Sequence, residues 1–185
     1  MYIIGITGTI GAGKGAVVEY LIQRGFTHFS ARELILDEVR RRGFKISREN
    51  TTNVANDLRT IHGPSYIIET LFYKAEESGK NCIIESIRAI GELEFLRTQK
   101  NFKLFAVDAD PELRHKRVLE RRSELDRVSL EQFLAEEKRE MFSTNPNEGS
   151  IIDCIKRADY VFENNGTKEE LYKKVEEILK KVTKN

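Results

Sequence analysis

The 185-residue chain has little cysteine, almost no net charge and no long apolar run. Its two cysteines, Cys82 and Cys154, have no cysteine or histidine at metal-ligand spacing, which favours reduced core positions over a metal site. A formal net charge of +1 gives no support for a nucleic-acid or membrane-surface partner, because either would favour a strong basic bias. No apolar segment is long enough to span a bilayer, and the chain opens in a predicted strand instead of a signal peptide, so we expect a cytoplasmic protein.

The apolar residues that are present make up 39% of the chain and fall in short runs between longer amphipathic stretches. For 185 residues, a single domain with its own core is the default. Five of the apolar runs are predicted strands: Tyr2–Thr7, Phe26–Phe29, Asn81–Glu85, Phe102–Val107 and Asp159–Glu163. Strands separated by helices indicate the α/β class, with a parallel sheet that is covered on both faces.

Two intervals between these strands are longer than the regular alternation requires. The interval 30–80 has room for two or three helices, and the interval 108–158 is also mostly helical. Only three prolines occur, and Pro64 and Pro111 are each predicted to be the first residue of a helix.

A glycine-rich segment lies between the first predicted strand and an amphipathic helical pattern. It matches the GxxxxGK pattern through Gly8, Thr9, Ile10, Gly11, Ala12, Gly13 and Lys14. The glycines allow consecutive backbone N–H groups to converge on phosphate oxygens, and the positive end of the helix dipole adds to the attraction. Because Lys14 can reach the terminal phosphates of a nucleoside triphosphate, this segment in this context predicts nucleotide binding.

The residue after Lys14 departs from the common pattern. Gly15 replaces the usual Ser or Thr, whose hydroxyl binds magnesium, and one interpretation is a decayed, inactive loop. The GAGKG run nevertheless resembles the loop of adenylate kinases and related nucleoside monophosphate kinases, which normally continue with Thr where this chain has Ala16. The resemblance implies a working ATP site whose Mg²⁺ is held mainly by phosphates and water, ligands that magnesium commonly keeps.

An acid and an arginine follow the third predicted strand. Glu85 stands where a Walker B carboxylate would orient the water shell of Mg²⁺, although it could instead cap the next helix. Residues 85–88 resemble the D-G-x-R stretch of nucleotide and deoxynucleotide monophosphate kinases, with Glu in place of Asp and Ser86 in place of Gly. This resemblance implies that Arg88 binds the acceptor phosphate, since a guanidinium can hold two phosphate oxygens at once.

Further candidates for the acceptor site follow the second predicted strand. Ser30 and Glu33 have the spacing of a helix capping box, which needs no function. The same segment resembles the monophosphate-binding S-T-G-D-L/M stretch of adenylate kinases, which would bring Ser30, Arg32 and Glu33 near the acceptor. Arg48 and Arg59 lie in a pattern similar to R-E-N…L-R…G-P in archaeal and bacterial relatives of these kinases, and are candidates for the same pocket or for a solvated helix face.

Arginines that follow the fourth predicted strand indicate a second phosphate-binding element. Arg114, Arg117 and Arg121 share one helix face at spacings of three and four. A lid that supplies arginines stabilises the negative charge that is spread over a transferred phosphoryl group. We expect Arg117 and Arg121 to act in this way, with Arg127 and Arg139 as further candidates, although most helical arginines are only solvated.

The last predicted strand runs into Asn164-Asn165-Gly166, which a turn before a helix N-cap explains. The segment also resembles the A-D-x-V-I-x-N-N-G-S stretch of dephospho-coenzyme A kinases, which lies beside the donor adenine. This resemblance implies that Asn164 and Gly166 contact the base through backbone groups. No triad or metal spacing links the three histidines, which we interpret as structural or surface residues: His28, His62 and His115.

The resemblance covers nearly the whole chain and implies a P-loop NTPase fold with three α/β/α layers around a five-stranded parallel sheet. Residues 1–29, 80–113 and 157–185 would form the core, with an acceptor-binding insertion at 30–79 and a helical lid at 114–156. The implied activity is transfer of the γ-phosphoryl group of ATP, with Mg²⁺, to a small-molecule nucleotide. We expect no nucleic-acid or membrane partner, and either a monomer or a weak homodimer.

Three functions remain open. Dephospho-coenzyme A kinases carry Asp-Ala-Asp where this chain has Ser30-Ala31-Arg32, and a carboxylate base helps them to activate a ribose hydroxyl. A monophosphate is already an anionic nucleophile and calls for cations, which favours a nucleoside or deoxynucleoside monophosphate as acceptor. Glu33 could still serve as a displaced base, and the missing hydroxyl after Lys14 would also suit a non-catalytic nucleotide-binding switch.

Overall fold

The computed structural model describes residues 1–120, 129–141 and 150–183. One sheet of five parallel strands forms its centre: β1 Ile3–Gly8, β2 Thr27–Ser30, β3 Cys82–Glu85, β4 Phe102–Asp108 and β5 Tyr160–Glu163. The strand order is β2-β3-β1-β4-β5, so the strand that leads into the glycine-rich segment lies in the middle. The predicted parallel sheet and all five predicted strands are confirmed.

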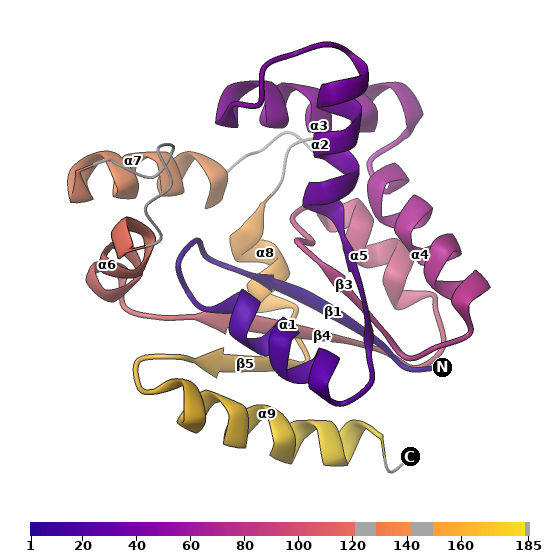
Figure 1. Ribbon diagram of the computed structural model, residues 1–185, viewed down its shortest axis with the longest axis vertical. Helices are drawn as coiled ribbons and strands as arrows, with labels where there is room; N and C mark the ends of the chain where they lie inside the picture. The colour runs from indigo at the N-terminus through magenta and orange to yellow at the C-terminus, as the bar shows by residue number, and fades with distance from the viewer. Residues whose placement is uncertain (121–128, 142–149, 184–185) are drawn as a thin grey trace.

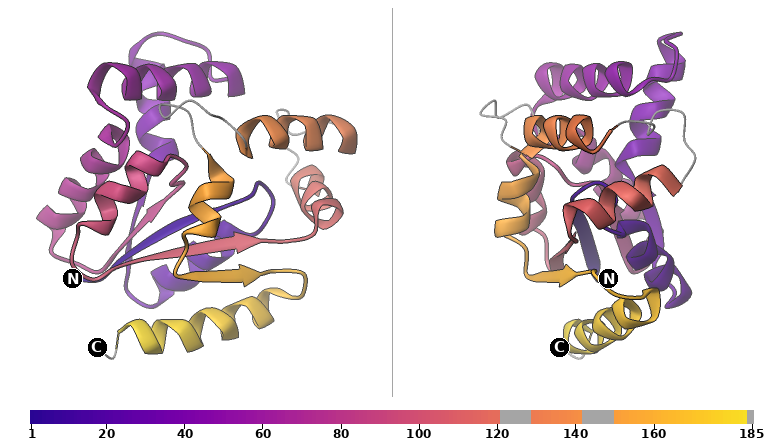
Figure 2. Two further views of the ribbon diagram at one scale, coloured as in Figure 1. Left: turned by 180° about the vertical axis from the view of Figure 1, so that it is seen from behind. Right: turned by 90° about the vertical axis from the view of Figure 1, so that its left-hand side faces the viewer.

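Helices cover both faces of the sheet, as the sequence predicts. Helices α1 (Lys14–Gln23) and α9 (Lys168–Val182) pack on one face, and α4 (Tyr66–Ser78), α5 (Ile90–Arg97) and α8 (Ile151–Lys156) pack on the other (Figures 1 and 2). Side chains of β1 alternate between these two layers, with Ile3 in one core and Ile4 in the other. Because both faces are buried, every residue of β1 is apolar or small, apart from one buried threonine.

The other helices follow the carboxyl ends of strands. Helices α2 (Ala31–Arg41) and α3 (Arg48–His62) come after β2, while α6 (Pro111–Glu120) and α7 (Leu130–Met141) come after β4. The two pairs lie on different sides of the segment that joins β1 to α1 (Figure 1). The described residues of both predicted intervals are therefore mostly helical, as predicted. Among the described residues, no helix is both long enough and apolar enough to cross a membrane.

The two prolines that were predicted to open helices differ in outcome. Helix α6 begins at Pro111, as predicted. The prediction for Pro64 is wrong, because α4 begins at Tyr66 with Ser65 as its N-cap. Pro64 lies instead in a turn in which Gly63 has a φ of 108° and accepts a 3.2 Å hydrogen bond from the Tyr66 N–H.

Both cysteines are buried and unpaired, which confirms their predicted core positions. Burial raises the pKa of the Cys82 thiol to about 11 and that of the Cys154 thiol to about 12. Neither thiol is therefore suited to act as a nucleophile or metal ligand near neutral pH.

Candidate functional site

The turn between β1 and α1 can be formed only by glycine at three positions. Gly8, Gly11 and Gly13 have φ values of 137°, 78° and 104°, which side chains rarely adopt. Space is also lacking: a Cβ on Gly8 would collide with the Val107 backbone, and one on Gly13 would collide with the amide nitrogen of Asn164. The turn is therefore fixed against β4 and against the loop after β5, with its backbone at the N-terminus of α1, as an anion cradle requires.

Lys14 is the first residue of α1 and folds back over this turn. Its Nζ donates hydrogen bonds of 2.8 Å to the carbonyl oxygens of Gly8 and Thr9. The Thr9 hydroxyl in turn donates a 2.6 Å hydrogen bond to Oδ1 of Asp108 at the end of β4. These contacts hold the ammonium group at the turn itself, where the terminal phosphates of a nucleotide would bind.

Gly15, which replaces the usual magnesium-binding hydroxyl, lies in the first turn of α1 with open space around it. A Cβ on Gly15 would meet no heavy atom within 4 Å, so packing does not require glycine at this position. Within residues 1–120, 129–141 and 150–183, no three His, Cys, Asp or Glu side chains gather as a metal site. Gly15 itself supplies no side-chain ligand for a metal ion at this position.

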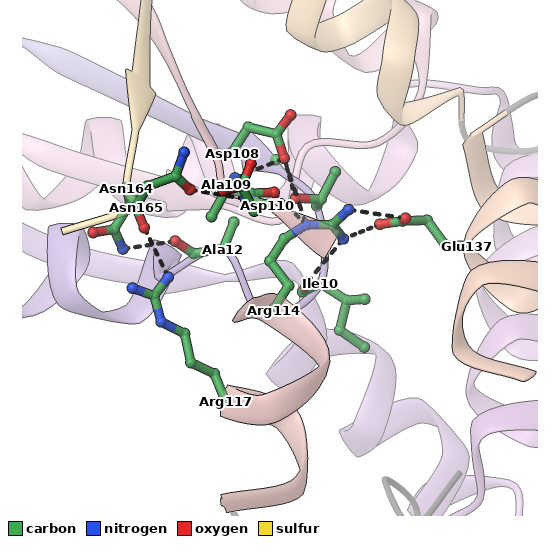
Figure 3. Close-up of polar contacts among 12 residues, drawn as sticks. Ile10, Ala12, Asp108, Ala109, Asp110, Arg114, Arg117, Glu137, Asn164 and Asn165 are labelled. Atoms are coloured by element: carbon green, nitrogen blue, oxygen red, sulfur yellow. Dashed lines mark hydrogen bonds and ion pairs between the residues drawn. The ribbon is translucent and has the colours of Figure 1, made fainter. Parts of the chain in front are cut away.

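The loop after β5 is tied to both the phosphate-binding turn and α6 (Figure 3). The buried Asn164 side chain donates a 2.8 Å hydrogen bond to the Ala12 carbonyl. Arg117 donates to the carbonyl oxygens of Asn164, at 2.9 Å, and Gly166, at 3.5 Å. The backbone N–H of Asn164 donates to Asp108 O at 2.8 Å, so both backbone polar groups of Asn164 are already bound. Arg117 therefore lies at the loop predicted to contact the donor base.

Arg114, which the sequence analysis placed on one helix face with Arg117, is not exposed on that face but forms a buried hub between α6, α7 and the phosphate-binding turn (Figure 3). Its side chain is only 4% exposed and forms a two-pronged ion pair with Glu137 of α7. The guanidinium also donates to the carbonyl oxygens of Ala109, at 2.7 Å, and Ile10, at 3.4 Å. Arg114 therefore links α7 to α6 and to the phosphate-binding turn.

Glu85 lies at the end of β3, between β1 and β2, and its Oε2 is 3.0 Å from Nε2 of His28. Burial raises the pKa of Glu85, but the hydrogen bond with His28 and the attraction of His28, Lys14 and Arg88 outweigh it. The pKa of this carboxyl therefore lies below its ordinary value, and Glu85 is ionised at neutral pH. His28, interpreted from the sequence as structural or surface, is a direct partner of a candidate site residue.

Glu85 does not cap the next helix, which was the other role considered for it. Helix α5 begins at Ile90, and Glu92 reaches back to the backbone N–H groups of Arg88 and Ala89. Glu85 thus stays at the strand end, where ligand sites of open parallel sheets lie.

Four predicted acceptor residues, Ser30, Arg32, Glu33 and Arg88, share this end of the sheet. Ser30 is the last residue of β2, stands beside Glu85 in the register and caps α2 by accepting from the Glu33 N–H at 3.4 Å. Arg32 and Glu33 are exposed in the first turn of α2, and Arg88 is exposed in the loop after β3. Of the predicted capping box, the structure shows the hydrogen bond that the Ser30 side chain accepts from the Glu33 N–H. The side chain of Arg32 is exposed at the start of α2.

The remaining predicted arginines differ in what the structure shows. Arg59 is 5% exposed and pairs with the fully buried Glu92, so it lies inside the protein and not on a solvated helix face. Arg48 begins α3, but its side chain lies outside the described part of the structure, as does that of Arg139 in α7. Arg121 and Arg127 lie outside the described residues.

Asp108 is a further candidate site residue, which the sequence analysis did not identify. It ends β4, the neighbour of β1, and its Oδ1 accepts hydrogen bonds from the Thr9 hydroxyl, at 2.6 Å, and the Ala109 N–H, at 2.9 Å. Glu85 was identified as an acid at the carboxyl end of a strand beside β1. Asp108 has the same position at the end of β4, so the same signal identifies it.

A protein-family model described as an AAA domain matches residues 4–142. The chain belongs to this family. A UPF0200 protein of Methanococcus maripaludis, strain C7, is 31% identical over 189 residues, which cover 100% of this chain and 99% of the relative. The chain is therefore also a member of the UPF0200 proteins.

Solved kinases share the architecture. Shikimate kinase from Bacteroides thetaiotaomicron aligns with a TM-score of 0.59 at 16% identity, covering 97% of this chain and 98% of that one. Dephospho-CoA kinase from Campylobacter jejuni aligns with a TM-score of 0.54 at 19% identity, covering 100% of this chain and 98% of that one. The fold is therefore P-loop kinase-like, while these identities are too low to carry an activity across.

Replacement of Arg114 tests its role as a hub. Arg114→Met leaves Glu137 in the interior without its cation and should lower the free energy of unfolding by about 3–5 kcal/mol. The double variant Arg114→Met/Glu137→Met should recover part of this loss, because no unpaired charge remains. Denaturant unfolding measures both. Arg157→Met, which breaks an exposed 3.5 Å pair with Glu94, is the control and should cost about 0–1 kcal/mol. An Arg114→Met variant as stable as this control would show that Arg114 does not compensate the buried charge of Glu137.

A matched pair of substitutions tests the missing hydroxyl at Gly15. Gly15→Ala and Gly15→Ser both fit the open space and should both stabilise the first turn of α1, by roughly 0.5–1 kcal/mol for alanine. Only serine adds a magnesium-binding hydroxyl, so Gly15→Ser alone should lower the Mg²⁺ concentration at which ATP binding is half-maximal. Equal Mg²⁺ dependence of the two variants in calorimetric titrations would show that this position does not face the metal.

Proposed function

We propose that this protein is an ATP-dependent phosphotransferase that moves the γ-phosphoryl group to a nucleoside or deoxynucleoside monophosphate. The observation that supports this most is the arrangement of charges at the end of β3. Glu85 lies close enough to Lys14 and Arg88 for both cations to lower its pKa. A donor-phosphate lysine and an acceptor-phosphate arginine would then flank one carboxylate, as transfer between two phosphates requires.

Two segments of the structure support the proposed donor site. The turn from Gly8 to Lys14 would bind the triphosphate, and the loop from Asn164 to Gly166 with Arg117 would border the base. Bound Mg²⁺ neutralises charge on the phosphates, and Glu85 would hold its water shell in place. Arg117 contacts that loop directly. We therefore propose that Arg117 supports the loop beside the donor base and does not bind the transferred phosphoryl group.

The proposed acceptor site uses Arg88 as its main phosphate ligand. Ser30, Arg32 and Glu33 are further candidates, because β2 ends beside Glu85 and α2 begins there. Arg59 is left out as a direct ligand, since it binds Glu92 in the interior. Arg121 and Arg48 remain predictions for the transferred phosphoryl group and for the acceptor.

A hydroxyl acceptor such as dephospho-coenzyme A is the second candidate. The observation that favours it is the ionised Glu85, because a carboxylate at the strand end could accept the proton of a hydroxyl. The cations Lys14 and Arg88 beside the same carboxylate favour a phosphate acceptor, since a monophosphate needs charge compensation and no base.

A coupled ADP-release assay with magnesium-ATP and a panel of acceptors tests the proposal. The panel contains the common ribonucleoside and deoxyribonucleoside monophosphates together with dephospho-coenzyme A. We expect turnover with at least one monophosphate. Turnover with dephospho-coenzyme A alone would transfer the assignment to hydroxyl phosphorylation, and binding of ATP without any turnover would indicate a non-catalytic switch.

Two alanine variants separate the donor and acceptor phosphates. Lys14→Ala should lower kcat by about 10²–10³-fold or more, because it removes a cation from the transferred group. Arg88→Ala should raise the acceptor KM by roughly 10–100-fold and leave the KM for ATP nearly unchanged, as expected for loss of one charge-assisted contact.

Arg40→Ala is the control for both variants, because Arg40 is an exposed residue of α2 that pairs with Asp37. Its kinetics should match those of the wild type. An Arg88→Ala enzyme with an unchanged acceptor KM would remove Arg88 from the acceptor site.

A further inference from the structure

The loop from Ser86 to Ala89 carries Arg88 and is held firmly against β1. The Ile6 carbonyl accepts hydrogen bonds from the N–H groups of Ser86, at 3.1 Å, and Ile87, at 3.2 Å. The Thr7 hydroxyl donates a buried 2.8 Å hydrogen bond to the Ile87 carbonyl. Ser86 has a φ of 72°, an uncommon conformation for a residue other than glycine, which persists only where the surroundings determine it.

The second half of the loop depends on Glu92. This carboxylate is 0% exposed, and its Oε2 accepts hydrogen bonds from the backbone N–H groups of Arg88, at 2.9 Å, and Ala89, at 3.1 Å. Its other oxygen accepts from Nε and Nη2 of Arg59, at 3.0 and 2.8 Å. A buried carboxylate needs a cation that compensates its charge, and Arg59, itself 5% exposed, lies in that position.

We propose that Arg59 is a positioning residue, which acts through Glu92 to hold Arg88 where the acceptor phosphate binds. This inference rests on the proposed function. Arg59 lies in α3, within the insertion between β2 and β3, so the ion pair joins that insertion to the loop that carries Arg88. The loop is thereby arranged before the acceptor arrives, which reduces the ordering that binding would otherwise have to bring about.

Arg59→Met tests the inference, because it keeps an unbranched apolar stem and removes the charged guanidinium. Its acceptor KM, for the monophosphate that the wild type turns over, should rise at least about tenfold, and its KM for ATP should stay within about twofold. Arg59→Lys keeps the charge without the two-nitrogen fork and should show a smaller rise.

The matched control is Arg97→Met. Arg97 lies at the other end of α5 and pairs with Asp159 at 2.8 Å, away from the loop. This variant should leave both KM values unchanged. A parallel rise of both KM values in Arg59→Met would indicate general loosening of the protein and would overturn the proposed role.

Amide hydrogen exchange without nucleotide gives a readout that does not depend on the reaction. Exchange at Arg88 and Ala89 should be at least about tenfold faster in Arg59→Met than in the wild type, with exchange across β1 unchanged. Unchanged exchange at these two amides would overturn the inference even in an active kinase. If the wild type phosphorylates no monophosphate, the proposed function fails, and the exchange rates alone decide whether Arg59 supports the loop.

Discussion

The close packing of the turn between β1 and α1 against β4 and the loop after β5 is the constraint on which the rest of this structure depends. Three glycines with positive φ form the turn, and Gly8 and Gly13 leave no room for a side chain against β4 and the loop after β5. Lys14 folds back onto the carbonyls of the same turn. The anion cradle is therefore a rigid product of chain packing, which is the condition for binding a phosphate without reorganisation.

Two buried ion pairs extend this rigidity to either side of the cradle. Arg114 and Glu137 connect α7 to the turn, and Arg59 and Glu92 connect α3 to the loop that carries Arg88. Each pair costs desolvation that an apolar contact would avoid, so its presence is better explained by the placement of neighbouring groups than by stability. The surroundings of both the proposed donor and the proposed acceptor are thus supported from helices outside the sheet.

The sequence was sufficient to predict the parallel sheet, the glycine-rich turn and the helical intervals, because hydrophobic periodicity and glycine spacing are local signals. It could not reveal the buried ion pairs, since Arg59 and Glu92 are 33 residues apart and each resembles an ordinary charge on a helix surface. His28 was interpreted as structural or surface for the same reason: its partner Glu85 is 57 residues away and meets it only across the sheet. The prediction that Pro64 opens a helix was wrong, because a turn with Ser65 as the N-cap makes α4 begin two residues later.

The proposed function requires two phosphate sites, one for the donor and one for the acceptor, side by side at the carboxyl edge of the sheet. Calorimetric titration with bisubstrate analogues, in which adenosine is joined through five phosphates to adenosine, uridine or thymidine, tests this most directly. We expect at least one analogue to bind orders of magnitude more tightly than ATP, because its second half binds at high effective concentration. Affinities no greater than that of ATP for all three analogues would contradict the proposed function.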